Sequence, residues 1–166
     1  MESELNINRF ETDVRQKVKA CVDQANDYFN TNIEMPIIKC SQKGSAAGTA
    51  YLQRHEVRFN HYMYVQNPAL FVSNVVPHEV AHLFVYQLFG REPKPHGVEW
   101  QSVMVKVFDV EPKRTHDFII KPTSNTFLYA CACSNHSLTV RRHNKILKGV
   151  IYQCRQCKKG LKKVAL

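Results

Sequence analysis

The stretch VVPHEVAHLFVYQLFG spans residues 75–90 and decides how this chain folds. On a helix, His78 and His82 project from the same face because they lie four positions apart. At that spacing both imidazoles reach one metal ion at the roughly 2.0–2.1 Å that Zn–N bonds require. Glu79 is close enough to act on a metal-bound water without being a ligand. The pattern is typical of zinc hydrolases, in which such a glutamate is the general base.

The residues around this stretch predict a buried helix over Ala69–Phe89. Apolar side chains dominate the range, Asn67-Pro68 suits its start and Gly90 suits its end. Pro77 is predicted to kink the helix just before the histidines, and a new helix beginning near Pro77 is the alternative. Two histidines and a glutamate inside an apolar helix are unfavourable unless something pairs with them. This favours a metal site over a buried polar cluster without metal.

A catalytic zinc usually takes three protein ligands and leaves a fourth position for water. His96 is the preferred third ligand, because it follows the turn-forming segment 90–95 and precedes a predicted helix over Val98–Phe108. The alternative for His96 is a solvent-exposed loop histidine. His55 and His61 are expected at the edge of a hairpin and not at the metal. The remaining candidates are His116, His136, His143, Glu92 and Glu99.

Four cysteines near the C-terminal end form two close pairs, which predict a closed, tetrahedral structural zinc site. The pairs are Cys131 with Cys133 and Cys154 with Cys157. His136 in place of Cys131 is an alternative ligand, and a redox role for the second pair is the rival interpretation. The residues between the pairs, 137–142 and 146–152, are predicted as two strands that turn at Asn144-Lys145. So small a hairpin needs a metal to fold.

Positive charge is concentrated in the C-terminal third. Residues 1–111 have a formal charge of −2, whereas residues 112–166 have +11, which together give the +9 of the chain. Such asymmetry favours a segment that binds nucleic acid through its phosphates, with a merely soluble basic tail as the alternative. Phe127, Tyr129 and Tyr152 would stack on bases or pack the ribbon. The candidate phosphate-binding residues are Arg141, Arg142, Lys145, Lys148, Lys158 and Lys159.

The N-terminal half completes an α+β organisation. Apolar residues spaced by three and four predict a helix over Asn8–Asn30, and strands are expected at 36–40, 49–53 and 56–60, with the last two paired. Helices packed on one face of such a sheet form an α+β layer architecture. The expected domains are a main domain over 1–111, a linker over 112–126 and a basic zinc ribbon over 127–166.

No secretory signal is expected from the acidic and polar first residues, and no stretch is long and apolar enough for a membrane span. A cytoplasmic location is therefore expected, with no membrane partner. Six cysteines in that compartment favour thiols and metal ligands over disulfides. The sequence leaves the oligomeric state open.

Residues 75–104, VVPHEVAHLFVYQLFGREPKPHGVEWQSVM, resemble the metallopeptidase core of the SprT family, whose eukaryotic relatives include Spartan. Members pair the helical motif with a later His-Gly-x-Glu-aromatic segment, matched here by His96, Gly97, Glu99 and Trp100. The tail is also similar to bacterial SprT proteins at 129–133, 140–144 and 152–157. The resemblance implies a minimal zincin-like fold in which an edge strand beside the metal pairs with the substrate. It also implies His78, His82 and His96 as zinc ligands and Glu79 as catalytic base.

The leading hypothesis is a zinc metalloendopeptidase with one catalytic and one structural Zn²⁺. It would act on proteins associated with nucleic acid. The resemblance implies, more narrowly, that the substrates are proteins bound or crosslinked to DNA. Single-stranded DNA is the favoured nucleic acid partner. The alternative is a nucleic-acid-binding or transcription-associated zinc protein with little or no peptidase activity. A third possibility is a zinc hydrolase that acts on something other than peptides.

Overall fold

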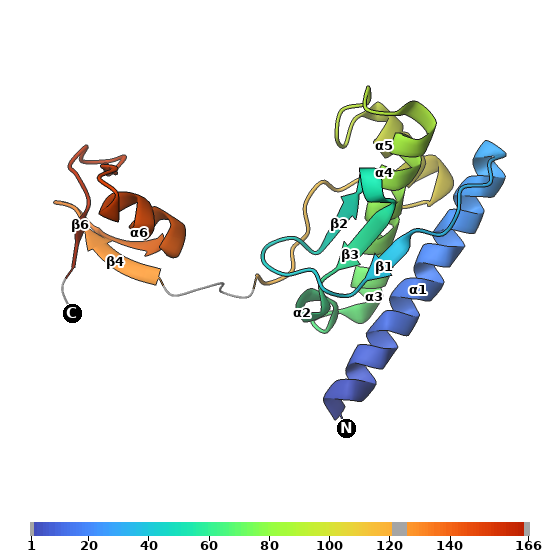
Figure 1. Cartoon of the computed structure of the whole chain (residues 1–166), viewed down its shortest axis with the longest axis horizontal. Coiled ribbons are helices and arrows are strands. Elements are labelled where there is room, and N and C mark those ends of the chain that lie inside the picture. Colours follow the sequence, from blue (N-terminus) through green and yellow to red (C-terminus); the bar gives the residue numbers. More distant parts are fainter. Residues whose placement is uncertain (1, 121–125, 165–166) are drawn as a thin grey trace. The chain divides into compact units, whose positions relative to one another are not determined.

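The computed structural model describes residues 2–120 and 126–164, with side chains from Leu5 onward. The chain forms two compact units, Met1–Lys121 and Pro122–Leu166 (Figure 1). The first unit combines helices with a small sheet, and the second combines one helix with a second small sheet, so the mixed helix and sheet class is as predicted. Within the described residues, no helix combines the length and apolar character that crossing a membrane requires.

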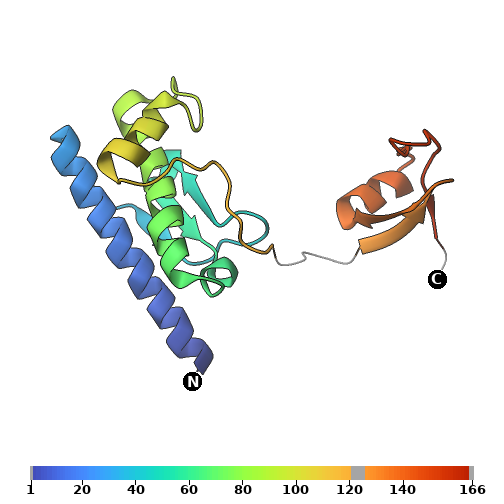
Figure 2. The same cartoon turned by 180° about the vertical axis from the view of Figure 1, so that it is seen from behind.

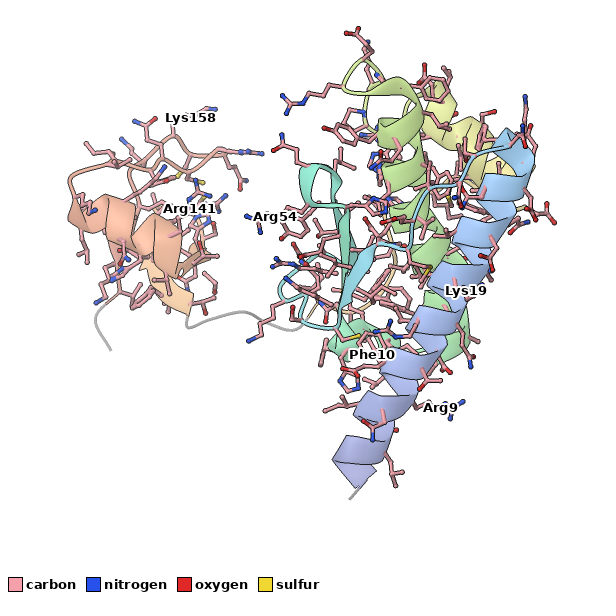
Figure 3. All side chains as sticks on the ribbon, turned by 45° about the vertical axis from the view of Figure 1, so that its right-hand side comes forward. Arg9, Phe10, Lys19, Arg54, Arg141 and Lys158 are labelled. Atoms are coloured by element: carbon pink, nitrogen blue, oxygen red, sulfur yellow. The ribbon has the colours of Figure 1, made fainter. Side chains whose placement is uncertain are left out.

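The long N-terminal helix α1, Glu2–Phe29, buries one face against the rest of unit 1 (Figure 2). The predicted apolar stripe is confirmed, because its members are fully buried except for the partly buried Phe29, and Phe10 points into the body of the unit (Figure 3). The stripe contacts α4, the helix that carries the histidine motif. The buried stripe residues are Phe10, Val14, Val18, Cys21 and Ala25.

A three-stranded sheet covers the other side of α4. Its strands are β1 (Ile37–Lys39), β2 (Gly48–Tyr51) and β3 (Glu56–Phe59), in the order β1-β3-β2. The predicted pairing of the last two is confirmed, since β2 runs antiparallel to β3 with Ala50 opposite Val57. Strand β1 runs parallel to β3. The order leaves β2 at an edge of the sheet, and β2 also packs against α4.

The motif helix is built from three consecutive helical segments. After the short helix α2 (His61–Tyr64) come α3 (Pro68–Leu70), a π-helical turn η2 (Phe71–Val75) and α4 (Val76–Phe89). Pro77 lies in the first turn of α4, where its missing N–H is tolerated because the preceding π turn has already changed the hydrogen-bond pattern. The alternative of a new α-helix near Pro77 is thus right in part, because α4 begins at Val76 but follows the π turn without a break. Gly90 ends α4 with a φ of 68°, and its N–H bonds to the Tyr86 carbonyl.

A second helical segment and an extended strap complete unit 1. The helix predicted at 98–108 consists of α5 (Val98–Ser102) and a π-helical stretch η3 (Val103–Val107). The chain then runs over unit 1 as the strap, residues 110–119. The sequence placed this region in a linker, but Phe118 packs on the core beside Phe71, and Gln66 bonds both backbone groups of Ile119. The expected boundary at residue 111 is therefore too early, and residues 121–125 of the linker lie outside the described residues.

Unit 2 differs from the predicted ribbon in one element. Strands β4 (Thr126–Ala130), β5 (Asn135–Thr139) and β6 (Lys162–Lys163) form a sheet in the order β5-β4-β6. The two strands predicted at 137–142 and 146–152 are wrong beyond Thr139, because helix α6 (Val140–Leu147) replaces the hairpin. The helix turns His143 inward, where its ring stacks on Phe127 at 3.6 Å between centroids and bonds the Tyr129 hydroxyl at 2.8 Å. This buried contact stabilises a helix that strand propensity alone did not suggest.

Candidate metal centres

Three imidazoles in unit 1 converge on one point. His78 and His82 project from one face of α4, and His96 reaches them from the loop before α5. The Nε2 atom of His96 lies 3.0 Å from that of His78 and 3.1 Å from that of His82. Nitrogens bound tetrahedrally to one zinc ion lie roughly 3.3–3.4 Å apart, so the donor set fits zinc closely. The structure thus brings together the three histidines that the sequence selected.

The loop holds His96 by backbone geometry. His96 adopts a left-handed conformation with a φ of 58°, and Gln101 donates a 3.0 Å hydrogen bond to its carbonyl. The next residue, Gly97, bonds the Lys94 carbonyl through its N–H at 2.8 Å, and a Cβ there would lie 2.9 Å from that oxygen. Glycine therefore permits the tight turn that directs His96 toward α4.

Trp100 packs beneath the three imidazoles. Its ring centroid lies 4.7 Å from that of His78, 5.5 Å from that of His82 and 4.7 Å from that of His96. The side chain is 1% exposed. The sequence identified Trp100 only as part of a motif. Its packing against the three imidazoles depends on the contact between α5 and α4.

Burial keeps the three histidines in the form that would bind a metal ion. It lowers the pKa of His78 to about 4 and that of His82 to about 3, each further lowered by neighbouring histidines. The pKa of His96 is lowered as well, by burial and by the nearby charge of Arg114. All three imidazoles are therefore neutral near pH 7, and neutral imidazole is the ligating form.

Glu79 is held next to this cluster but points toward strand β2. The side chain is 6% exposed, and the backbone N–H of Ala50 bonds its carboxylate. Burial raises the pKa of Glu79 to about 8, and the Ala50 bond partly opposes this shift. A divalent cation at the three histidines would favour the carboxylate form. The arrangement is a ligand set with an adjacent, non-ligating carboxyl group.

The strap contacts the cluster of three histidines at His78. A backbone hydrogen bond joins Lys113 to the His78 ring, which orients the imidazole in the way that outer contacts of metal ligands usually do. His116, one of the candidates for third ligand, instead places its Nε2 3.0 Å from the Ser45 carbonyl and anchors the strap. His55 bonds the Glu34 carbonyl, and His61 packs against Phe10 with their rings tilted, so neither joins the cluster.

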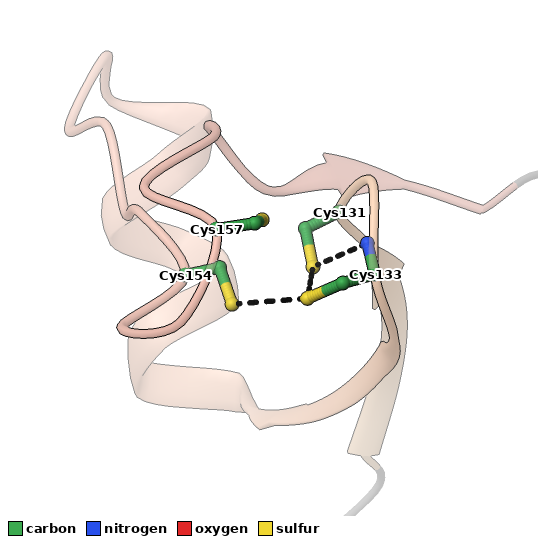
Figure 4. Close-up of side chains that lie close together, drawn as sticks. All are labelled: Cys131, Cys133, Cys154 and Cys157. Atoms are coloured by element: carbon green, nitrogen blue, oxygen red, sulfur yellow. Dashed lines mark hydrogen bonds between the residues drawn. The ribbon is translucent and has the colours of Figure 1, made fainter.

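The second centre lies in unit 2, where four sulfur atoms come together (Figure 4). Cys131 and Cys133 lie in the turn between β4 and β5, and Cys154 and Cys157 lie in the turn before β6. The Sγ atoms of Cys131 and Cys133 are 3.4 Å apart, and those of Cys133 and Cys154 are 3.7 Å apart. Sulfurs bound tetrahedrally to zinc lie about 3.8 Å apart. The four thiols therefore fit a structural zinc site better than a single redox pair.

His136, the alternative ligand of this centre, lies beside the four thiols. Its Nε2 is 3.2 Å from the Cys131 sulfur. The donor atoms that lie close enough together to share one metal ion are the sulfurs of the four cysteines. The Cys133 N–H and then His136 lower the pKa of Cys131 to about 5, which favours the thiolate that zinc binds. The structure thus favours the four cysteines as the ligand set, with His136 in contact with one of them.

The candidate phosphate-binding residues line the exposed face of α6 and the second cysteine turn. Arg141, Arg142 and Lys145 lie on α6, and Lys148 follows at its C-terminal cap. Lys158 and Lys159 lie in the cysteine turn; Figure 3 labels Arg141 and Lys158. All six are exposed.

Comparison with known proteins gives the class of both units. Residues 18–116 match the SprT-like family, and residues 125–164 match the SprT-like zinc ribbon domain. The chain belongs to the SprT-like family, which confirms the resemblance noted in the sequence.

Relatives match the chain over nearly its whole length. Protein SprT of Actinobacillus succinogenes is 42% identical over 166 residues, which covers 99% of this chain and 97% of the relative. Protein SprT of Pasteurella multocida is 43% identical over 160 residues, covering 95% and 96%. Protein SprT of Yersinia pestis is 43% identical over 155 residues, covering 92% and 91%. No solved structure was found to match the chain.

Proposed function

We propose that this chain is a zinc metalloendopeptidase that acts on proteins associated with nucleic acid. The observation that carries the proposal is the convergence of His78, His82 and His96 beside the buried carboxyl group of Glu79. Zinc bound by these histidines would supply Lewis acidity and lower the pKa of a coordinated water to about 7. Glu79 would accept a proton from the attacking water and deliver it to the leaving amine.

Strand β2 supports a peptide as the substrate, in keeping with a minimal zincin-like arrangement. The Asn60 N–H bonds the Ala47 carbonyl at 2.9 Å and so continues the ladder between β2 and β3. Because hydrogen-bonded and non-hydrogen-bonded pairs alternate in an antiparallel ladder, the backbone groups of Gly48 and the carbonyl of Ala50 face the free edge. The Ala50 N–H points the same way and bonds Glu79. This edge lies beside Glu79, where an extended peptide could add as a strand. Backbone pairing of this kind tolerates many substrate sequences.

Unit 2 supports the association with nucleic acid. The cations of α6 and of the cysteine turn are exposed and held on a folded element. Lysine and arginine contacts to phosphate give affinity with little sequence preference. We favour single-stranded DNA as the partner, and a nucleic-acid-binding protein without peptidase activity is the alternative function.

Substitution of Glu79 by glutamine tests the peptidase proposal. Glu79→Gln keeps the size of the side chain but removes its proton-accepting role, so zinc content and thermal unfolding should stay near those of the wild type. Turnover of a denatured protein, with and without single-stranded DNA, should fall at least about 100-fold, as expected for loss of a general base. If the wild type cleaves no protein under either condition, the alternative function is favoured. If both proteins cleave equally well, Glu79 is not the base.

We further propose that the chain binds two zinc ions that mutation can separate. His82→Ala should remove the ion of unit 1, and Cys154→Ser with Cys157→Ser should remove the ion of unit 2. Elemental analysis of the wild type and of each variant measures this directly. A single zinc ion in the fully loaded wild type would contradict the proposal.

A further inference from the structure

Strand β2 begins with Gly48, at a position where any larger side chain would clash with Glu79. A Cβ built on Gly48 would lie 2.6 Å from Cγ, 2.8 Å from Oε1 and 3.0 Å from Cδ of Glu79. Carbon atoms that are not bonded to one another pack at about 3.5–4.0 Å. The Glu79 side chain thus fills the space that a side chain at position 48 would need.

Backbone conformation does not explain this glycine. The glycines with positive φ are Gly44, Gly90 and Gly149, whereas Gly48 has the ordinary backbone of a strand. A strand position accepts most residues, and glycine in a strand often marks the close approach of another group. Here the approaching group is Glu79.

Glu79 is restrained from a second direction. The Ala50 N–H, two residues along the same strand, bonds its carboxylate, and only 6% of the residue is exposed. Helix α4 fixes the backbone of Glu79, Gly48 limits where the side chain can lie, and Ala50 sets the direction of its carboxylate. Strand β2 therefore determines how far the carboxylate lies from the three histidines.

We propose that Gly48 is a positioning residue for Glu79, and that its missing side chain keeps the carboxylate in place for proton transfer. This inference rests on the proposed peptidase function. Glu79 would have to swing away from β2 to make room for a methyl group at position 48, and it would lose the Ala50 bond. A misplacement of about 1 Å in a catalytic group can lower the rate by about 100-fold.

The first experiment compares Gly48→Ala with the matched control Gly160→Ala in the zinc-loaded full chain. At Gly160 an added Cβ would meet no atom closer than 3.9 Å, so the same methyl group fits there. With denatured casein as substrate, Gly48→Ala should lower kcat by about 100-fold while KM and zinc content stay near wild type. Gly160→Ala should keep the wild-type kcat. Wild-type kcat in Gly48→Ala would overturn the inference.

A double-mutant cycle tests the contact without any assay of activity. Trp100 is the one tryptophan of the chain, so its fluorescence follows the unfolding of unit 1. Gly48→Ala should lower Tm by about 5 °C in the wild type but by less than about 2 °C in the Glu79→Ala background, where the clashing atoms are absent. Equal losses in both backgrounds would overturn the inference. If Gly48→Ala fails to fold, the double variant should still fold.

The two experiments separate the inference from the function on which it rests. A wild type that cleaves no protein would contradict the peptidase proposal, whatever the unfolding cycle gives. An active wild type with an equally active Gly48→Ala variant would contradict the positioning role alone.

Discussion

The indole N–H of Trp100 donates a 3.2 Å hydrogen bond to the backbone carbonyl of His78. The same ring lies against all three imidazoles of the metal cluster. Trp100 therefore joins α5 to the first turn of α4 and packs beneath the three histidines. An outer contact of this kind sets the orientation of the ligands before metal binds.

Trp100→Phe should weaken zinc binding by unit 1 while the fold persists. Phenylalanine keeps an aromatic ring but loses the donor to His78 and leaves a small cavity. Loss of an outer partner typically lowers metal affinity by about 10- to 100-fold. Competition with a chromophoric chelator measures the affinity. Phe108→Leu is the control, because Phe108 is also buried in the core, while the rings in contact with the imidazoles do not include it. Equal zinc affinity in wild type and Trp100→Phe would contradict this role.

The strap predicts where unit 1 can be cut. A chain ending at residue 120 keeps the Lys113 contact to His78 and the packing of Phe118, and should fold and bind zinc like the full chain. A chain ending at residue 111 loses both. Its Tm should fall by at least about 5 °C, since losing a partly buried phenylalanine costs about 1–2 kcal/mol, and its zinc affinity should fall about tenfold. Thermal unfolding and chelator competition compare the two chains, and equal results would make the strap dispensable.

The sequence predicted the parts of the site that depend on local geometry. The spacing of His78 and His82 defines one helix face in any context. His96 could be predicted because it lies between a turn-forming segment and a predicted helix. Contacts between distant segments gave no such signal. The approach of Gly48 to Glu79 and of Lys113 to His78 arises only when β2 and the strap fold onto α4.

Helix α6 shows why a local pattern can also mislead. Its β-branched and basic residues suggested a strand, although Val140 and His143 lie three positions apart, at helical spacing. A single buried histidine was a weak signal for an inward face. Its stacking on Phe127 and its bond to Tyr129 decide the outcome, and neither is visible before β4 is in place.

The protonated carboxyl group of Glu79 should stabilise metal-free unit 1 at low pH, and this contribution should be lost as pH rises. Burial raises the pKa of Glu79 from 4.5 to about 8, so the folded state holds a proton that the unfolded chain releases. The stability from this group is complete below pH 4.5 and is lost as pH rises to about 8. His78, whose pKa burial lowers from 6.5 to about 4, acts in the opposite sense and loses stability as pH falls through that range.

Glu79→Gln isolates the first effect. In chelator, the free energy of unfolding of the wild type relative to Glu79→Gln should fall by on the order of a few kcal/mol between pH 5 and pH 8. Urea unfolding followed by Trp100 fluorescence measures the difference at each pH. With zinc restored, the difference should shrink, because the cation favours the carboxylate. Parallel pH profiles for the two metal-free proteins would contradict the raised pKa.

Arg141 and Arg142 define the exposed side of α6, whose inward side is held by His143. Helix α6 and the cysteine turn carry their cations on the surface of a unit with few acidic residues, since residues 126–164 contain neither Asp nor Glu. Phosphate groups near this surface would meet no repelling carboxylate. The expected binding is electrostatic, with steep dependence on salt.

Arg141→Ala with Arg142→Ala should weaken binding to single-stranded DNA and reduce the slope of log affinity against log salt by about 1–2, because each phosphate contact on a single strand contributes about 0.7. The matched control, Arg9→Ala with Lys19→Ala, removes two exposed cations from α1 and changes the net charge equally. It should leave the slope within about 0.3 of the wild type, as expected when no phosphate contact is lost. Titration of a labelled oligonucleotide at several salt concentrations distinguishes the pairs. Equal slopes for both variants would mean that net charge, and not the face of α6, governs binding.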